Sequence, residues 1–194
     1  MFEDQDSSRD VRVLKPEQVK FDKNNHTLLL VVDNSLLGSD HLSDTAEVRG
    51  LQSKSEFHVT VIGFRAGKII EKALKVLNEP DRKAKETEIE QLSQETDWEF
   101  STDSQSLFHI QKDYSDSKQS KSKETRESII QTVNMPGLAV FYRRLNEILG
   151  VNLEAPPAHI TLYTGGTNPA TSKMGIGIDT PAALNELHPE RLET

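Results

Sequence analysis

The chain has 194 residues and a formal net charge of −8 at pH 7. This acidity argues against tight, sequence-independent binding of long nucleic acid, which depends on neutralising phosphates. The sequence contains no cysteine, which excludes disulfides, thiol nucleophiles and cysteine-based zinc sites.

The length is sufficient for one domain, or for two closely packed lobes, around a sizeable core. The N-terminus, Met1 to Asp6, is acidic and polar, unlike a secretory signal or a transit peptide. No apolar run approaches the roughly 20 residues needed to span a bilayer. We therefore expect a soluble, cytoplasmic protein with no membrane partner, and a monomer by default.

The first part of the chain predicts a polar arm followed by two strands. Residues 1–24 are polar and are expected to be irregular. The Leu- and Val-rich run 26–33 predicts a buried strand, and residues 35–55 predict a long connection with weak helical character. Residues 57–63 alternate apolar and polar side chains and predict a second strand.

Helices are expected in the middle of the chain. Apolar residues at helical spacing predict a helix from Gly67 to about Leu77. Pro80 interrupts this pattern, and a charged helix is predicted from Asp81 to about Gln94. Two half-buried strands and a Ser- and Lys-rich loop or hairpin tip are expected next, at 98–100, 107–110 and 113–125.

The last third predicts a strand at 128–133 and then a helix with clear end signals. Asn134 is expected to cap this helix, Pro136 lies in its first turn, and Gly150 ends it. The remaining expected elements are a strand at 158–164, a short final strand at 175–178 and a short helix at 181–187.

One tetrapeptide pattern occurs twice, as His58-Val59-Thr60-Val61 and as His159-Ile160-Thr161-Leu162. Each copy lies in a strand-like run, where side chains alternate between the two faces. The histidine and the threonine of each copy therefore share one face, and the residue between them points to the core. His58 and His159 are 101 residues apart (159 − 58), a spacing that suits an internal duplication of the fold.

Two histidines beside two hydroxyls can perform acid–base chemistry on a phosphodiester. Because free imidazole titrates near 6.5, one ring of a pair can be a neutral base while the other is a charged acid. The hydroxyls of Thr60 and Thr161 can donate hydrogen bonds to non-bridging phosphate oxygens. No metal or other cofactor is required by this arrangement.

The duplicated motif resembles that of the 2H phosphoesterase superfamily, which includes RNA 2′,3′-cyclic phosphodiesterases once called 2′-5′ RNA ligases. The resemblance covers about residues 26–180 and implies a two-lobed, pseudo-twofold α+β fold. In this fold two antiparallel sheets face a central cleft and helices lie outside. It implies His58 and His159 as the catalytic pair, and Thr60 and Thr161 as phosphate binders. The implied substrate is a nucleotide or a short RNA end.

The domain prediction follows from these elements: an N-terminal arm at 1–24, one bilobal domain at 25–180, and a C-terminal tail or short helix at 181–194.

Within the site, strand alternation places Tyr163 on the face of His159 and Thr161, as a possible aromatic of the cleft, although packing is the commoner role of such a residue. Other polar groups considered for the cleft are Arg126, Gln131, Lys173 and His109, the last more readily explained as a solvated histidine. His26, His41 and His188 are expected at the surface.

Several readings of the motif remain open. Which histidine is the base does not follow from the sequence, nor does the choice among a cyclic mononucleotide, a cyclic-phosphate RNA end, a 2′-5′ linkage and an ADP-ribose cyclic phosphate. A non-catalytic module that binds nucleotides or RNA ends would keep the same cleft. Catalytic zinc is less favoured because it takes three protein ligands, and the sequence has no His-x-His or His-Glu-x-x-His cluster.

Overall fold

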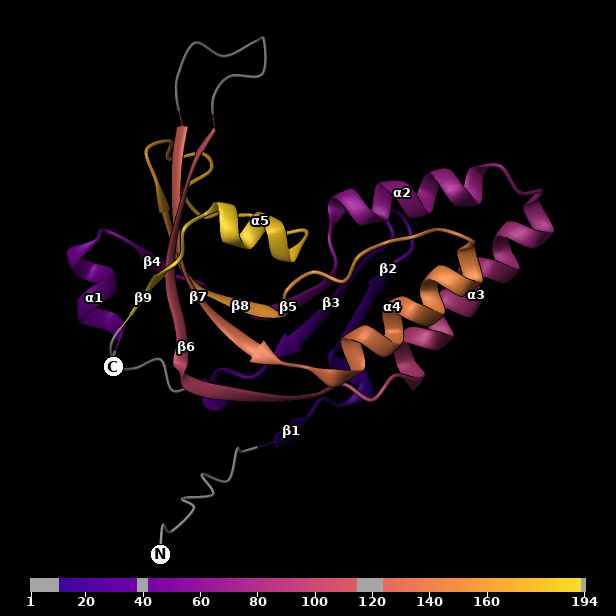
Figure 1. Cartoon of the computed structure of the whole chain (residues 1–194), viewed down its shortest axis with the longest axis horizontal. Helices are drawn as coiled ribbons and strands as arrows, with labels where there is room; N and C mark the ends of the chain where they lie inside the picture. The colour runs from indigo at the N-terminus through magenta and orange to yellow at the C-terminus, as the bar shows by residue number, and fades with distance from the viewer. Residues whose placement is uncertain (1–10, 38–41, 115–123, 193–194) are drawn as a thin grey trace, which may run out of the picture.

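The computed structural model describes residues 11–37, 42–114 and 124–192. Over these residues the protein is a mixed α+β structure built on a curled antiparallel sheet, a half-barrel (Figure 1). The strands are β1 (Val11–Val13), β2 (Val19–Asp22), β3 (Thr27–Val32), β4 (Gln52–Ser53), β5 (Phe57–Ile62), β6 (Glu99–Tyr114), β7 (Glu124–Asn134), β8 (His159–Gly166) and β9 (Glu190–Arg191).

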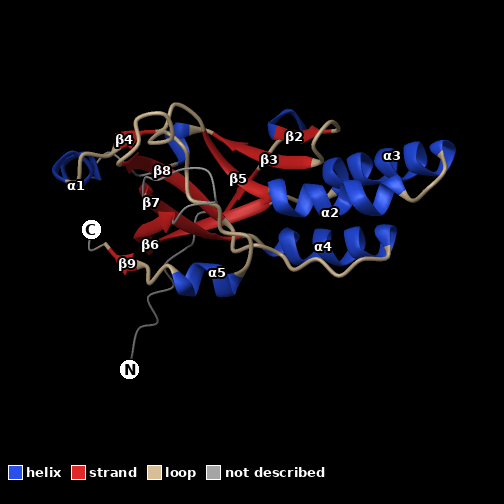
Figure 2. Cartoon of the chain, turned by 90° about the horizontal axis from the view of Figure 1, so that it is seen from above, coloured by secondary structure: helices blue, strands red, loops and turns tan. Residues whose placement is uncertain are grey.

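The helices are α1 (Ser43–Val48), α2 (Phe64–Lys75), α3 (Glu79–Glu95), α4 (Pro136–Leu149) and α5 (Pro181–Glu186). Helices α2, α3 and α4 lie together at one end of the molecule, while α1 lies at the opposite end (Figure 2). No helix in the described ranges has the length and apolar composition needed to cross a membrane.

The sheet is continuous, with the strand order β1-β6-β7-β8-β5-β3-β2. In addition, β4 pairs with β8, and β9 pairs with β6. The two motif strands, β5 and β8, are neighbours and pair through Val59 and Ile160. The family resemblance implied two antiparallel sheets facing each other across a central cleft. The described strands instead form one sheet, because this pairing joins the strands on either side of it.

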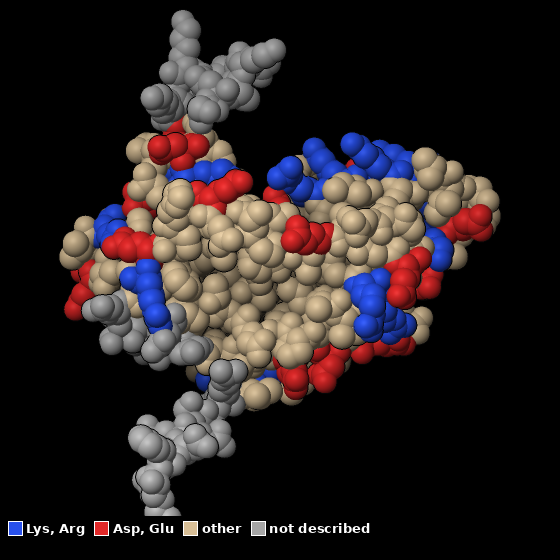
Figure 3. Space-filling model, viewed as in Figure 1, with Lys and Arg blue, Asp and Glu red and all other residues tan. Residues whose placement is uncertain are grey.

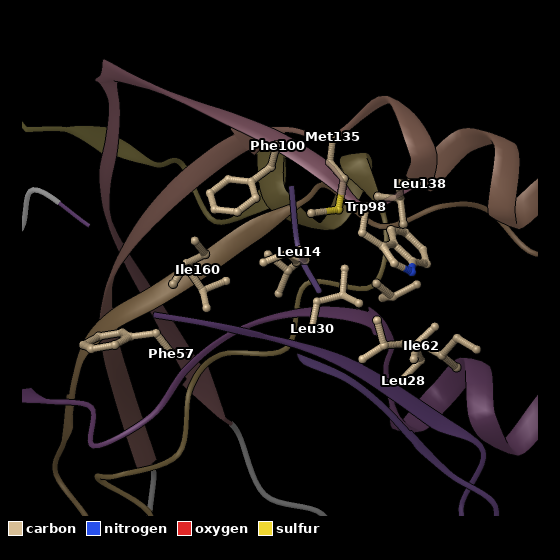
Figure 4. Close-up of a cluster of buried hydrophobic side chains, with 14 of the residues drawn as sticks. Leu14, Leu28, Leu30, Phe57, Ile62, Trp98, Phe100, Met135, Leu138 and Ile160 are labelled. Atoms are coloured by element: carbon tan, nitrogen blue, oxygen red, sulfur yellow. The ribbon is translucent and has the colours of Figure 1, made fainter. Parts of the chain in front are cut away.

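The main core lies on the face of the sheet that α2, α3 and α4 cover. Alternation along β3 and β5 sends Leu28, Leu30 and Val59 into it, each fully buried. Figure 4 shows how these strands and α4 bring large side chains together around Trp98. Burial of apolar area on this scale is the dominant stabilisation of the fold.

The opposite face of the sheet carries a second, smaller apolar cluster. Ile110 and Ile130 project from β6 and β7 and pack against Ile176 and Ile178. Residues 175–178 were predicted to be a final strand, but they form no strand. Their two isoleucines are buried although the segment pairs with no strand. Burial of every second residue gives the same alternating sequence pattern as a half-buried strand.

Most predicted elements are confirmed. Strands occupy 27–32, 57–62 and 159–166, and α5 begins at Pro181 with Thr180 as its cap. Helix α4 has Pro136 in its first turn and ends at Gly150, whose φ of 64° is left-handed and suits glycine. Its N-cap is Met135 rather than Asn134. Helix α2 begins at Phe64, before the predicted Gly67.

The prediction of an irregular arm at 1–24 is wrong for the part that the structure describes. Val11–Val13 pairs with β6, and Val19–Asp22 pairs with β3. Both strands lie at the ends of the sheet, where short, charged strands are common, and their sequences therefore carry little strand signal. Residues 1–10 lie outside the described residues.

The two strands expected at 98–100 and 107–110 are parts of one long strand, β6. Its ladder with β7 is irregular between Thr102 and Leu107, and this break interrupts the alternation seen in the sequence. Beyond it the ladder is regular to the pair Tyr114–Glu124. A loop or hairpin tip was predicted at 113–125; residues 113–114 and 124–125 belong instead to β6 and β7, which extend further than their alternation in the sequence shows, and residues 115–123 lie outside the described residues.

Candidate functional site

Both copies of the His-x-Thr motif line one cavity of about 500 Å³. His58 and Thr60 come from β5, and His159 and Thr161 come from β8. Figure 3 shows the molecule hollowed between the end of β6 and the start of α2, and both of these segments line the cavity. A volume of this size is within the range of small-molecule sites.

The pairing of the two motif strands explains how four side chains from distant parts of the sequence meet. Val59 and Ile160, the central residues of the motifs, pair directly and are fully buried. In an antiparallel pair this register sets His58 opposite Thr161, and Thr60 opposite His159. Because side chains alternate, all four point away from the main core.

His159 is buried and its ring orientation is fixed. Its Nδ1 lies 2.8 Å from the carbonyl oxygen of Pro157. A carbonyl can only accept, so Nδ1 carries the proton and Nε2 keeps its lone pair. Burial lowers the pKa of His159, the bond to Pro157 opposes this, and the charge of His58 lowers it further. The ring is therefore oriented by a neutral backbone group, and its pKa lies below the ordinary value of 6.5.

His58 is more accessible, with a side chain 30% exposed. Its Nδ1 is buried and makes no hydrogen bond within the described residues, and Glu56 Oε1 lies 3.7 Å away. Burial lowers the pKa of His58, the Glu56 carboxylate raises it, and Lys54 lowers it. The two histidines thus have the same place in their strands but different electrostatic surroundings.

The cavity wall carries cations although the whole chain is acidic. Lys54, Arg65 and Lys112 line it. Asp179, the acidic residue of the lining, lies 3.3 Å from the Arg65 guanidinium. This arrangement favours a small anion, since the attraction of the lysines is not offset by an unpaired carboxylate in the wall.

Each threonine lies beside a glycine that leaves room in the cavity. A Cβ on Gly175 would approach Thr161 Oγ1 to 3.4 Å, and one on Gly63 would approach Thr60 Cγ2 to 3.6 Å. Gly63 also caps α2, so the N-terminus of this helix opens on the cavity beside Thr60. Backbone N–H groups at such an end favour anions.

Tyr163 is not part of the cavity, and the prediction that it shares the face of Thr161 is wrong. Thr161 pairs with Ile130, whereas Tyr163 pairs with Ile129, the adjacent residue of β7. Leu162 is therefore the extra residue of a β-bulge, which reverses the alternation. Tyr163 packs against the main core instead.

The remaining candidates lie elsewhere. Arg126, Gln131 and Lys173 do not line the cavity, although Arg126 stacks on the ring of Tyr114, which does. His109 is buried rather than solvated and bonds to Glu127 at 3.0 Å. His26 is also buried, contrary to the prediction, and His188 is exposed as predicted. His41 lies outside the described residues.

Several cavity residues were missed by the sequence analysis. Lys54 lies just before β5, and Lys112 and Tyr114 are two apart in β6, so strand alternation offered a signal for the second pair; Glu56 lies beside His58 but lines a neighbouring cavity. Residues 175–179, which also line the cavity, offered none, because they are brought there by tertiary packing alone.

Comparisons with protein-family models, with curated proteins and with solved structures find no match to this chain. Among the described residues, no group of three or more His, Asp or Glu side chains is placed to hold a metal ion. The interpretation of the site therefore depends on its geometry.

Proposed function

We propose that the protein is a phosphodiesterase of the 2H type that hydrolyses a cyclic phosphate, on a 2′,3′-cyclic nucleotide or an RNA end, or a 2′-5′ linkage. One observation carries the proposal: both histidines and both threonines of the duplicated motif line a single cavity. His58 and His159 would be the general acid and base, and Thr60 and Thr161 would bind the non-bridging oxygens.

A two-lobed, duplicated fold is part of this proposal. From the junction of β5 and β8, the strand orders β5-β3-β2 and β8-β7-β6 run outward in matching sequence. Both motif strands also carry a bulge directly after the threonine, at Val61 in β5 and at Leu162 in β8. Bulges are retained features of a fold, so their equivalent positions support a common origin of the halves.

The charge and size of the cavity support a small phosphate-bearing substrate, and we propose that the reaction takes place in the cytoplasm. Lys54 and Lys112 provide positive charge at the wall, whereas the net charge of −8 disfavours a long polyanion. The reaction requires only proton transfers and charge stabilisation, so we propose that it needs no metal ion.

A hydrolysis screen tests the proposal. Candidate substrates are 2′,3′-cyclic mononucleotides, an oligoribonucleotide ending in a cyclic phosphate, and a 2′-5′-linked dinucleotide, each with and without EDTA and monitored by ³¹P NMR. We expect turnover of at least one substrate that survives EDTA and is nearly abolished by His58→Ala or His159→Ala. Full activity of either variant would contradict the proposal.

One observation favours a non-catalytic binding module as the second candidate. Burial lowers the pKa of both histidines, so the free protein has no strongly favoured imidazolium to act as the acid. A bound phosphate would raise both pKa values. Measurable affinity for nucleotide 2′- or 3′-phosphates, without turnover of any cyclic phosphate, would establish the binding module instead.

A further inference from the structure

The two histidines differ in the group that faces Nδ1. In His159 this nitrogen donates to the Pro157 carbonyl at 2.8 Å, an interaction with a neutral backbone group. In His58 the same nitrogen has no hydrogen bond within the described residues, and the Glu56 carboxylate is 3.7 Å away. A small rotation of this exposed glutamate would bring it to hydrogen-bond distance.

A carboxylate beside one imidazole separates the roles of the pair. It stabilises the imidazolium and orients the ring so that Nε2–H points away from it. A backbone carbonyl orients the ring as well but adds no net charge. The histidine beside the carboxylate is therefore the better proton donor, and the one beside the carbonyl is the better acceptor.

We propose that Glu56 is a positioning residue that makes His58 the general acid and leaves His159 as the general base. This inference rests on the function proposed above, and it assigns the two roles that the sequence leaves open.

The hydrolytic step is then balanced. Nε2 of His159 takes a proton from water as the water oxygen forms a bond to phosphorus. The bond from phosphorus to the leaving ribose oxygen breaks, and that oxygen takes the Nε2 proton of His58. The product is a phosphate monoester with a free hydroxyl, and exchange of protons with solvent restores both rings.

Other charges near His58 do not provide this function. Lys54 acts against the imidazolium, but its ammonium donates to the Lys173 carbonyl at 3.1 Å. Asp179, across the cavity, is paired with Arg65. The titratable and charged groups around His58 and its cavity are Lys54 and Glu56 before β5, His159 on β8, Lys112 and Tyr114 on β6, Arg65 on α2, Tyr142 on α4, and Asp179.

The test is the pH dependence of kcat for wild type and Glu56→Gln on a substrate found by the screen. Glutamine keeps the shape and removes the charge, so the pKa of His58 falls. If His58 is the acid, the alkaline limb of the profile moves to lower pH while the acid limb stays. Because Glu56 is exposed, we expect a loss of up to about fivefold on the alkaline side, reduced by 1 M salt.

Two control variants isolate the effect. Glu56→Asp keeps the charge and should restore the wild-type limb. Glu17→Gln removes a carboxylate from the neighbouring cavity, which is the one that Glu56 lines, and should leave the profile unchanged. NMR titration of the imidazoles should show a lower pKa for His58 in Glu56→Gln than in wild type.

The outcomes separate the two proposals. An active enzyme whose acid limb moves in Glu56→Gln, or whose profile is unchanged, overturns the assignment of roles and leaves the phosphodiesterase intact. Absence of turnover by wild type on every substrate overturns the proposed function, and the role assignment with it. A shift in Glu17→Gln equal to that in Glu56→Gln attributes the effect to net charge and also overturns the assignment.

Discussion

The two halves of the site have the same framework and different surroundings. On β5 and β8 the histidine, the threonine and the following bulge occupy the same positions. His159 nevertheless is buried against a backbone carbonyl, while His58 is partly exposed beside Glu56. The paired strands therefore bring the four groups together, whereas residues outside the motif decide what each imidazole does.

The bulge in β5 also connects the first motif to a helix of the second half. At this bulge the hydroxyl of Tyr142 in α4 donates to the Val61 carbonyl at 2.8 Å. Burial raises the pKa of Tyr142, so this hydroxyl keeps its proton and remains a donor. The geometry of the first motif therefore depends on a helix from the second half.

The largest expected effect comes from removing the histidines. His58→Asn and His159→Asn should each lower kcat by about 10²- to 10⁴-fold. Because the rings act in one proton-transfer sequence, the double variant should lose little more than the more damaging single variant. Steady-state kinetics on the cognate substrate measures this. If the double variant instead loses the product of the two single-variant factors, the two halves act independently.

Removing the hydroxyls tests whether the halves contribute equally to phosphate binding. Thr60→Val and Thr161→Val keep the shape of the side chain and should each lower kcat by roughly 10²- to 10³-fold, the cost of removing a charge-stabilising donor. Thr87→Val makes the same change on an exposed part of α3 and should have no effect. A loss in only one of the site variants would restrict phosphate binding to one half.

The sequence predicted what depends on local alternation. The strands of both motifs, the inward Val59 and Ile160, and the shared face of each histidine and threonine all follow from a period of two. Tyr163 was misplaced because one extra residue, Leu162, reverses that period, and a bulge has no reliable local signal. His26 and His109 were assigned to the surface because burial of a histidine depends on tertiary neighbours, here Glu86 and Glu127.

Close helix packing gives a smaller effect on stability in both halves. A Cβ on Gly67 in α2 would lie 2.3 Å from the Asn25 carbonyl oxygen, and one on Gly137 in α4 would lie 2.2 Å from that of Asp97. Since backbone must shift, Gly67→Ala and Gly137→Ala should each lower the free energy of unfolding by about 1–3 kcal/mol, measured by urea denaturation.

Gly177 provides the control, because a Cβ there would meet nothing within 4 Å. Gly177→Ala should leave the urea midpoint nearly unchanged. If only one of the two helix variants is destabilised, the two halves do not depend equally on close packing of their helices.

The smallest expected effect is the pH dependence of stability due to His159. Burial holds its folded pKa below the ordinary value of 6.5, so the unfolded chain binds the proton more readily. The free energy of unfolding should therefore fall as pH drops below about 6.5 and level off below the folded pKa. Glu71 and Glu124, whose pKa values are lowered from 4.5 by hydrogen bonds to Lys75 and Arg126, act only at lower pH.

His159→Asn should flatten the slope between about pH 7.5 and 5.5 more than His58→Asn does, because His58 is more exposed and Glu56 offsets its burial. Equal slopes in the two variants would mean that the histidines have the same electrostatic environment, contrary to the difference between the two halves.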